Sequence, residues 1–294
     1  MKFNIDDSAG FCWGVVRTIE IVEETLQKYP NRPVYVLGQI IHNPRESERL
    51  EKMGLCTIGH DDFPGIAAER PVVLIRAHGE PPSTYIAAEK HGIELIDATC
   101  PLVKNLQKRV AGFYKDGWQI VILGKHDHAE VVGLRGVCGD ECIVVRTPAE
   151  ALEKVDFSRK TVLVSQTTMD KFLFAEIRKA LEKKAAKLHT IENCEFRARD
   201  TICKYVSGRE EKLRDFAKAN DAVLFVAGRN SSNGKMLYGI CENANTRTYF
   251  MENYSEFRQE WLINAKNIGI TGATSTPQWY LKYVKSQLED KFAN

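Results

Sequence analysis

Three cysteines with similar surroundings are the residues of this chain best suited to carry chemistry. Cys12, Cys100 and Cys203 each precede an amphipathic run, then a Val/Ile/Leu-rich segment, then a second such segment that ends in polar residues. In every copy the first apolar segment ends at a glycine, namely Gly38, Gly124 and Gly228. Repetition of this kind predicts one structural module present three times. Three thiolates that meet at one centre would bind a metal and leave one coordination position open.

The sulfur ligands leave two kinds of metal centre open. Three thiolates suit zinc with a free fourth position, and they also suit an iron–sulfur cluster, which normally takes four cysteines. Cysteines at the starts of helices are expected to have lowered pKa values, because the helix N-terminus favours the thiolate that binds metal.

Polar side chains gather where the predicted strands end. The six loops contain His42 and Asn43; His78 and Gly79; His126, His128 and Glu130; Gln166, Thr167 and Thr168; Ser231, Ser232 and Asn233; and Ser275. Ligands of α/β proteins bind at the carboxyl ends of strands. Neutral donors beside helix N-termini suit an anion such as a diphosphate, because backbone amides and the helix dipole reinforce them.

A proton donor is the remaining requirement of such a site. In the segment HDHAE, His128 and Glu130 are two residues apart, so both face the same side if the chain is extended there. A carboxylic acid at Glu130 could then protonate a leaving hydroxyl group.

Helical and strand patterns alternate along the chain and must position these loops. Short apolar runs are separated by amphipathic runs, which predicts an α/β protein with parallel sheets and crossover helices. We expect three similar α/β lobes with boundaries just before the repeated cysteines: residues 1–98, 99–196 and 197–294, the last with a C-terminal helix.

The overall composition narrows the classes of protein. The 294 residues carry a formal net charge of +2, with Lys and Arg scattered among Asp and Glu, so nucleic acid is not an expected partner. We find no apolar stretch long enough for a membrane span and no signal-peptide layout, which predicts a cytoplasmic protein.

Five further cysteines lie outside the repeated positions. We interpret four of them as ordinary thiols: Cys56, Cys138, Cys142 and Cys241. The CGDEC segment, which contains Cys138 and Cys142, resembles half of a zinc site but has no second half. Cys194 is a weaker rival of Cys203 for the third ligand position.

Several segments together resemble one enzyme family. The chain contains, in this order, GFCWGVVRTIEIVE, IIHNP, AHG, DATCPLV, HDHAEVVG, SQTT, NSSN and GATSTP. Their order and spacing are similar to those of the 4-hydroxy-3-methylbut-2-enyl diphosphate reductases (IspH/LytB family), which catalyse the last step of the non-mevalonate (MEP/DOXP) isoprenoid pathway. The resemblance implies a pseudo-threefold trefoil of α/β lobes around an oxygen-sensitive [4Fe-4S] cluster. It also implies that the cluster ligands are Cys12, Cys100 and Cys203, and it excludes Cys194 as the third ligand.

The resemblance further implies roles for the loops. The substrate's hydroxyl would bind the open iron, and Glu130 would deliver protons with help from Thr167 or Thr168. Residues implied in substrate binding are His42, Asn43, His78, His128, Thr167, Thr168, Ser231, Ser232, Asn233 and Ser275. Two electrons and two protons would convert the allylic diphosphate to isopentenyl or dimethylallyl diphosphate, with ferredoxin or flavodoxin as electron donor. Ala129 departs from the family, which often has proline there.

Two other functions share the three cysteines. One is an open-iron [4Fe-4S] hydratase or dehydratase, which would use no net electrons. The other is a non-enzymatic metal-binding redox sensor or scaffold with a structural zinc, which would be colourless. Consumption of a reduced dye with formation of prenyl diphosphates distinguishes the reductase from both.

Overall fold

The computed structural model describes residues 1–188 and 195–293, so Cys194 lies outside the described residues. The chain divides into two compact units. The first unit contains Met1–Glu20, Gln39–Leu55 and Lys204–Asn294, and the second contains Ile21–Gly38 and Cys56–Cys203. The division falls within the first helix, α1 (Trp13–Lys28).

The first unit is built on a four-stranded sheet in the order β1-β12-β10-β11. Its strands are β1 (Lys2–Ile5), β10 (Ala222–Val226), β11 (Thr248–Met251) and β12 (Asn267–Gly272), and all three pairs are parallel. Its helices are α2 (Pro44–Lys52), α9 (Lys204–Ser207), α10 (Glu210–Lys218), α11 (Ser232–Ala244) and α12 (Gln278–Phe292). The N-terminal strand β1 thus belongs to the same sheet as the last three strands of the chain.

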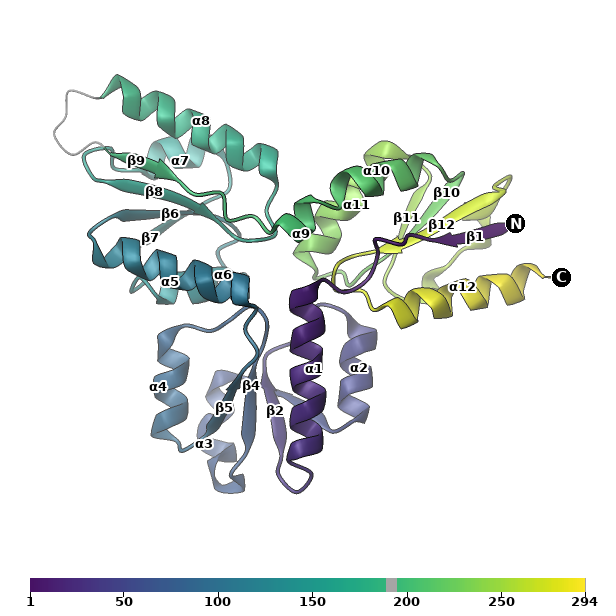
Figure 1. The fold of residues 1–294 in the computed structure, drawn as a ribbon, viewed down its shortest axis with the longest axis horizontal. Helices are drawn as coiled ribbons and strands as arrows, with labels where there is room; N and C mark the ends of the chain where they lie inside the picture. The colour runs from purple at the N-terminus through teal and green to yellow at the C-terminus, as the bar shows by residue number, and fades with distance from the viewer. Residues whose placement is uncertain (189–194, 294) are drawn as a thin grey trace. The chain divides into compact units, whose positions relative to one another are not determined.

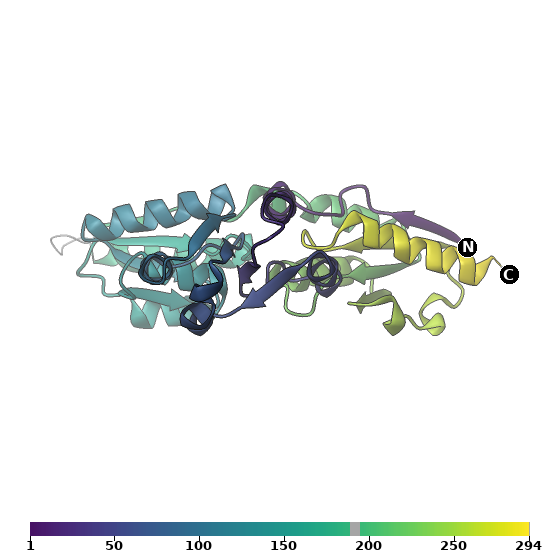
Figure 2. The same ribbon diagram turned by 90° about the horizontal axis from the view of Figure 1, so that it is seen from below.

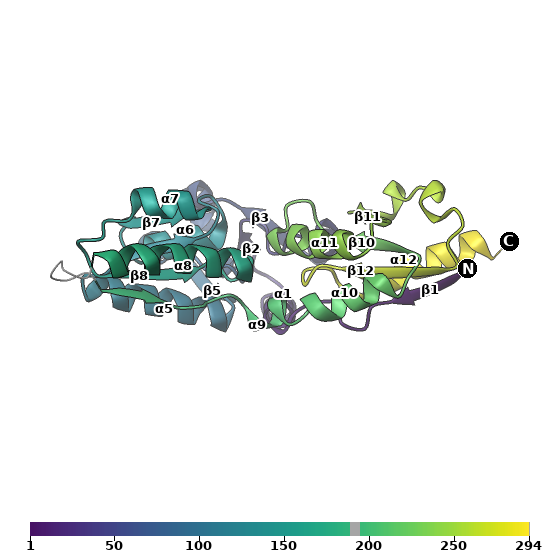
Figure 3. The same ribbon diagram turned by 90° about the horizontal axis from the view of Figure 1, so that it is seen from above.

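Helices cover both faces of this sheet (Figures 1 and 3). On one face, Leu281 and Val284 of α12 pack against alternate strand residues such as Leu224 and Ile270. Figure 2 shows α12, in yellow, lying along the sheet beside β1. On the other face, α10 and α11 bury Leu213 and Leu237 with the intervening strand residues. Because both faces are covered, β10 is apolar and buried at every position, as is typical of a parallel sheet.

The second unit contains two more four-stranded sheets. The first has the order β3-β2-β4-β5, with strands β2 (Val34–Leu37), β3 (Leu55–Ile58), β4 (Val72–Ile75) and β5 (Glu94–Asp97). Helices α3 (Phe63–Ile66) and α4 (Pro82–Lys90) follow β3 and β4, and they help to bury Val73 of the central strand β4. The pairs β2·β4 and β4·β5 are parallel.

The other sheet of this unit has the order β7-β6-β8-β9, and all of its pairs are parallel. Its strands are β6 (Gln119–Leu123), β7 (Cys142–Val145), β8 (Thr161–Ser165) and β9 (Phe196–Ala198). Its helices are α5 (Pro101–Lys115), α6 (Ala129–Gly136), α7 (Pro148–Lys154) and α8 (Lys171–Lys187). Helices α5 and α6 pack on one face and α7 and α8 on the other (Figure 1).

Short 3₁₀ turns complete the described secondary structure, at His60–Asp62, Ala67–Glu69, Tyr254–Glu256 and Gln259–Leu262. The prediction of an α/β protein with three similar parallel sheets and flanking helices is confirmed. Within residues 1–188 and 195–293, none of the helices combines the length and the hydrophobicity that crossing a bilayer requires.

Candidate functional site

Glu130 and Thr167 form a buried polar pair in the second unit, joined by two hydrogen bonds. The backbone nitrogen of Thr167 donates to Oε1 of Glu130 and the Thr167 hydroxyl donates to Oε2, both at 2.7 Å. Only 2% of Glu130 and 8% of Thr167 are exposed. Both oxygens of one buried carboxyl group are therefore held by a single residue.

Burial sets the protonation of this carboxyl group. It raises the pKa of Glu130 from its ordinary value to about 7, although the two hydrogen bonds from Thr167 act in the opposite direction. A carboxylic acid with this pKa carries its proton in a substantial fraction of molecules at neutral pH. It can therefore donate that proton to a bound ligand.

The secondary structure explains how Glu130 reaches this position, and it corrects one expectation. The HDHAE segment is not extended at Glu130, because α6 begins at Ala129. His128 is the N-cap of this helix, and its side chain accepts a hydrogen bond from the Glu130 nitrogen at 3.2 Å. This cap provides a hydrogen-bond acceptor for an amide of the first helical turn, and α6 begins directly after it.

The two neighbouring threonines have different partners. Thr167 bonds to Glu130, whereas the Thr168 hydroxyl accepts a hydrogen bond from Nε2 of Gln166 at 2.9 Å. Gln166 in turn accepts from the Lys125 nitrogen at 3.2 Å, so it joins the loops that follow β6 and β8. The sequence alone could not separate Thr167 from Thr168, because both follow the same strand.

Two histidines of the second unit lie together. The rings of His78 and His128 meet edge to face, with centroids 5.3 Å apart. His78 follows β4 and precedes Gly79, whose φ of +72° favours glycine and whose Cβ would approach Nε2 of Gln107 to 2.9 Å. His126 bonds instead to its neighbour Asp127 and is mostly exposed.

Cys100 and Cys203 lie near Glu130 in the same unit. The nitrogen of Cys203 donates to the Thr167 carbonyl at 2.8 Å, and Cys100 is the N-cap residue of α5. Burial raises the pKa of Cys100, and the negative charges of Cys203 and Glu130 raise it further. The expected lowering is therefore wrong for Cys100. Two helix amides, those of Leu102 and Val103, do lower the pKa, but desolvation outweighs them.

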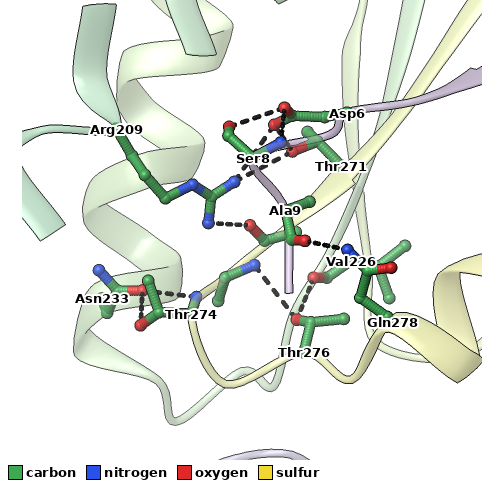
Figure 4. A network of polar contacts seen from close by, with 12 residues as sticks. Asp6, Ser8, Ala9, Arg209, Val226, Asn233, Thr271, Thr274, Thr276 and Gln278 are labelled. Carbon is green, nitrogen blue, oxygen red and sulfur yellow. Dashed lines mark hydrogen bonds and ion pairs between the residues drawn. The ribbon is translucent and has the colours of Figure 1, made fainter. Parts of the chain in front are cut away.

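Cys12 belongs to the first unit and directly precedes α1. Its nitrogen donates to the Thr274 carbonyl at 3.1 Å, which fixes it to the loop after β12. Thr274 also donates twice to Oδ1 of Asn233, from its nitrogen at 2.9 Å and from its hydroxyl at 2.7 Å (Figure 4). The amide nitrogen Nδ2 of Asn233 is buried and has no hydrogen-bond partner among the described residues.

Two serines lie beside this group. The hydroxyls of Ser231 and Ser275 are 3.3 Å apart, and both residues are buried. Ser231 is the N-cap of α11 and accepts a hydrogen bond from the Gly234 nitrogen at 3.0 Å. Ser232 is the first residue of α11. The loops after β10 and β12 thus bring hydroxyl and amide donors to one helix N-terminus.

The loop that carries His42 and Asn43 belongs to the first unit as well. It packs against Gly228, where an added Cβ would collide with the His42 carbonyl oxygen. Nδ1 of His42 lies 3.1 Å from Oε1 of Gln39. Asn43 is buried and caps α2, because its Oδ1 accepts from the Glu46 nitrogen at 3.1 Å. Asn43 therefore has a structural role that sequence reasoning did not foresee.

The structure gives the remaining described cysteines ordinary surroundings. Cys56 is exposed, whereas Cys138 and Cys241 are buried. Burial raises the pKa of Cys241 to about 11. The thiol of Cys138 hydrogen-bonds to half-buried Cys142 and lowers the pKa of that residue, so the CGDEC cysteines contact each other.

Sequence reasoning missed the buried ion pair of Asp6 and Arg209, whose Oδ2 and Nη2 atoms are 3.2 Å apart in the first unit. The two residues are separated by most of the chain, and no motif connects them. The one hint of this ion pair in the sequence is that Asp6, a charged residue, lies six positions before the repeated Cys12.

Comparisons with known proteins cover the whole chain. The family model of the LytB protein matches residues 4–289. A 4-hydroxy-3-methylbut-2-enyl diphosphate reductase from Chloroherpeton thalassium is 45% identical over 100% of this chain and 98% of the relative. The same-named protein from Bacteroides thetaiotaomicron is 44% identical over 98% of each chain.

Two solved structures are also similar. One is a structure of (E)-4-hydroxy-3-methyl-but-2-enyl diphosphate reductase, described as the terminal enzyme of the non-mevalonate pathway. It matches with a TM-score of 0.70 and 34% identity over 99% of this chain and all of that chain. The other is the E-1-hydroxy-2-methyl-but-2-enyl-4-diphosphate reductase from Plasmodium falciparum, with a TM-score of 0.85 and 28% identity over 98% of this chain and 88% of that chain. The family model and the full-length relatives agree, and the chain belongs to the LytB family of 4-hydroxy-3-methylbut-2-enyl diphosphate reductases.

Proposed function

We propose that this protein reduces 4-hydroxy-3-methylbut-2-enyl diphosphate to isopentenyl diphosphate and dimethylallyl diphosphate, as the last enzyme of the non-mevalonate pathway. The reaction breaks the allylic C–O bond, consumes two electrons and two protons, and releases the hydroxyl as water. Membership of the LytB family over the whole chain is the observation that carries this proposal.

We propose that Cys12, Cys100 and Cys203 hold a [4Fe-4S] cluster. All three are half-buried cysteines, and each stands next to the start of a helix, at α1, α5 and α9. Partly solvent-shielded thiolates are the ligands that such clusters take. The cluster would supply electrons and a Lewis-acidic iron with a free position.

The substrate's diphosphate would be bound by neutral donors and backbone amides. In the first unit, Ser231, Asn233 and Ser275 lie beside the N-terminus of α11, and Nδ2 of Asn233 is a buried donor with no partner among the described residues. Helix N-termini favour anions because their amides are unsatisfied and the dipole is positive there. We assign to the same function His42, Asn43, His78, His128, Thr167, Thr168 and Ser232.

Glu130 would be the proton donor. It is buried, its pKa is about 7, and both of its oxygens are held by Thr167. A fixed carboxylic acid of this kind protonates a leaving hydroxyl effectively because its pKa is close to the working pH. Of the two threonines, we therefore assign the supporting role to Thr167, whose hydroxyl contacts the Glu130 carboxyl group.

Three further features extend the proposal. The electrons would come from a ferredoxin or a flavodoxin, as the resemblance to the reductase family implies. The cysteines of residues 1–188 and 195–293 form no disulfide bonds, and this use of cysteine favours the cytoplasm. The predicted lobes 1–98, 99–196 and 197–294 would surround the cluster as a trefoil, with β1 counted in the last lobe because it pairs with β12.

An anaerobic assay tests the proposed function. Purified protein with reconstituted cluster is mixed with reduced methyl viologen and the allylic diphosphate, and dye oxidation and products are measured together. We expect two electrons consumed for each molecule of product. Turnover of the diphosphate without dye oxidation would support the hydratase or dehydratase, and a colourless protein with bound zinc would support the redox sensor.

A further inference from the structure

Hydrogen bonds hold the segment between β1 and Cys12 at the carboxyl end of the sheet β1-β12-β10-β11 (Figure 4). The Asp6 nitrogen donates to the Ile270 carbonyl at 2.9 Å, and Nε2 of Gln278 donates to the Ala9 carbonyl at 2.8 Å. At the far end, the Cys12 nitrogen donates to the Thr274 carbonyl. The position of Cys12 thus depends on how well this short segment is held.

Asp6 makes the largest number of these contacts. Its Oδ1 accepts from the nitrogen and the hydroxyl of Ser8, at 2.8 and 2.7 Å. Its Oδ2 accepts from the Thr271 hydroxyl at 2.7 Å and from Nη2 of Arg209 at 3.2 Å. Because Asp6 is only 4% exposed, its carboxylate is stabilised by these four donors rather than by water.

Arg209 is buried to the same extent, with 4% of its surface exposed. Besides Asp6, its guanidinium binds the Gly272 carbonyl through Nη1 at 3.0 Å, so it bridges the segment to the end of β12. Burial lowers the pKa of Arg209, whereas the negative charges of Asp6 and Cys12 raise it. Arg209 also lines the same pocket as Gly10 and Phe11, the two residues before Cys12, so its positive charge lies close to this cysteine in a poorly solvated region.

We propose that Arg209 is a positioning residue for Cys12: through Asp6 it fixes the segment that ends at this cysteine, and its buried charge favours the reduced state of the group that Cys12 holds. The inference rests on the proposed cluster. Reduction adds negative charge to a cluster, and a nearby positive charge in a region of low dielectric stabilises the reduced form. A buried ion pair often adds little to the stability of a fold, because removing both charges from water costs as much as their attraction gains. The burial of Asp6 and Arg209 is therefore better explained by a role in function.

Two substitutions separate the charge from the geometry. Arg209→Gln removes the charge and most of the hydrogen bonds, and Arg209→Lys keeps the charge but cannot bind Asp6 and Gly272 with a planar fork. Arg214→Gln is the matched control, because Arg214 lies in the same unit on α10 and forms a half-exposed ion pair with Glu210.

The readouts are measured anaerobically without substrate. They are the midpoint potential of the cluster and the rate of iron loss to a chelator. We expect a more negative midpoint potential for Arg209→Gln and iron loss several-fold faster than in the wild type. Arg209→Lys should keep the potential but lose iron faster, and Arg214→Gln should match the wild type in both measurements.

An unchanged midpoint potential in a folded Arg209→Gln protein would overturn the proposal. If Arg209→Gln does not fold, the rate of iron loss is measured for Arg209→Lys and Asp6→Asn instead. Wild-type rates of iron loss in both of these variants would overturn the proposal. The wild-type protein separates this inference from the proposed function. A wild type without any iron–sulfur cluster would contradict the proposed function, whereas a normal cluster with unaffected variants would contradict only the role of Arg209.

Discussion

Thr167 holds both oxygens of the Glu130 carboxyl group, one through its backbone nitrogen and one through its hydroxyl, each at 2.7 Å. The backbone bond cannot be removed by changing the side chain, but the hydroxyl bond can. Since both bonds favour the ionised carboxyl and burial favours the protonated one, the pKa of Glu130 results from two opposing effects. This relationship leads to three of the predictions that follow.

Replacement of Glu130 by Gln should remove the proton donor while keeping the shape of the side chain. We expect the cluster and the dissociation constant of the substrate to stay within about twofold of the wild type, and turnover to fall by about 10²- to 10⁴-fold. Iron quantification, isothermal titration and the viologen assay measure these three quantities. Full turnover in Glu130→Gln would exclude Glu130 from the mechanism.

The pH dependence of turnover should report the same group. Burial raises the pKa of Glu130 to about 7, so the proton is present below this pH and lost above it. We therefore expect kcat to decrease as pH rises through about 7 and the decrease to disappear in Glu130→Gln. A kcat that rises with pH over this interval would contradict the assignment of Glu130 as a proton donor.

Thr167→Val should shift this pH profile. The hydroxyl of Thr167 lowers the pKa of Glu130, so its loss should move the midpoint of the profile to higher pH. Loss of a hydrogen bond to a charged group costs about 1.5–3 kcal/mol, which corresponds to roughly tenfold or more in turnover if it misplaces the acid. Thr168→Val is the control for the pH midpoint alone, because the Thr168 hydroxyl bonds to Gln166 and not to Glu130. The midpoint of its profile should equal that of the wild type, whatever the change in the KM for the diphosphate.

The cysteines should divide into two groups. We expect Cys12→Ser, Cys100→Ser and Cys203→Ser each to lose the cluster, because a serine oxygen is a poor replacement for a thiolate ligand. Cys56→Ser and Cys241→Ser should keep it, since one side chain is exposed and the other is buried in an apolar cluster. Iron and sulfide assays on the five proteins test this, and loss of the cluster from Cys56→Ser would refute the assignment of ligands.

Asn233 should contribute to diphosphate binding through its amide nitrogen. Asn233→Asp keeps the oxygen that accepts from Thr274 but replaces the buried donor Nδ2 with an oxygen. We expect the KM for the diphosphate to rise by about tenfold or more, because a donor is lost and a like charge is added. Asn230→Asp is the control, since Asn230 is exposed in the same loop. Equal KM values in the two variants would contradict the assignment.

The sequence predicted the three parallel sheets because each of their central strands is apolar on both faces. Strands such as β6, β8 and β10 are buried at every position, and a continuous run of mostly apolar residues in the sequence indicates such a strand. The start of the helix at Ala129 was missed, because a single histidine cap does not stand out in a polar segment. The sequence also gave no reason to choose between Thr167 and Thr168, which only the position of Glu130 distinguishes.

Contacts between distant parts of the chain were beyond the reach of pattern reasoning. The ion pair of Asp6 and Arg209 depends on β1 lying beside β12, and neither residue is marked by any periodicity. Desolvation is equally invisible in a sequence, and for this reason the pKa of Cys100 was expected to be low when burial in fact raises it.

The pairing of β1 with β12 has a consequence for the order of folding during synthesis. The hydrogen bond between Thr271 and Asp6 joins residues 265 positions apart, so β1 leaves the ribosome long before its partner strand exists. Contacts of such high sequence separation form late, because the intervening chain must be brought together first. Cys12 therefore acquires its anchored position only after β12 and Thr274 have been made, and a metal centre that depends on Cys12 would mature after that point.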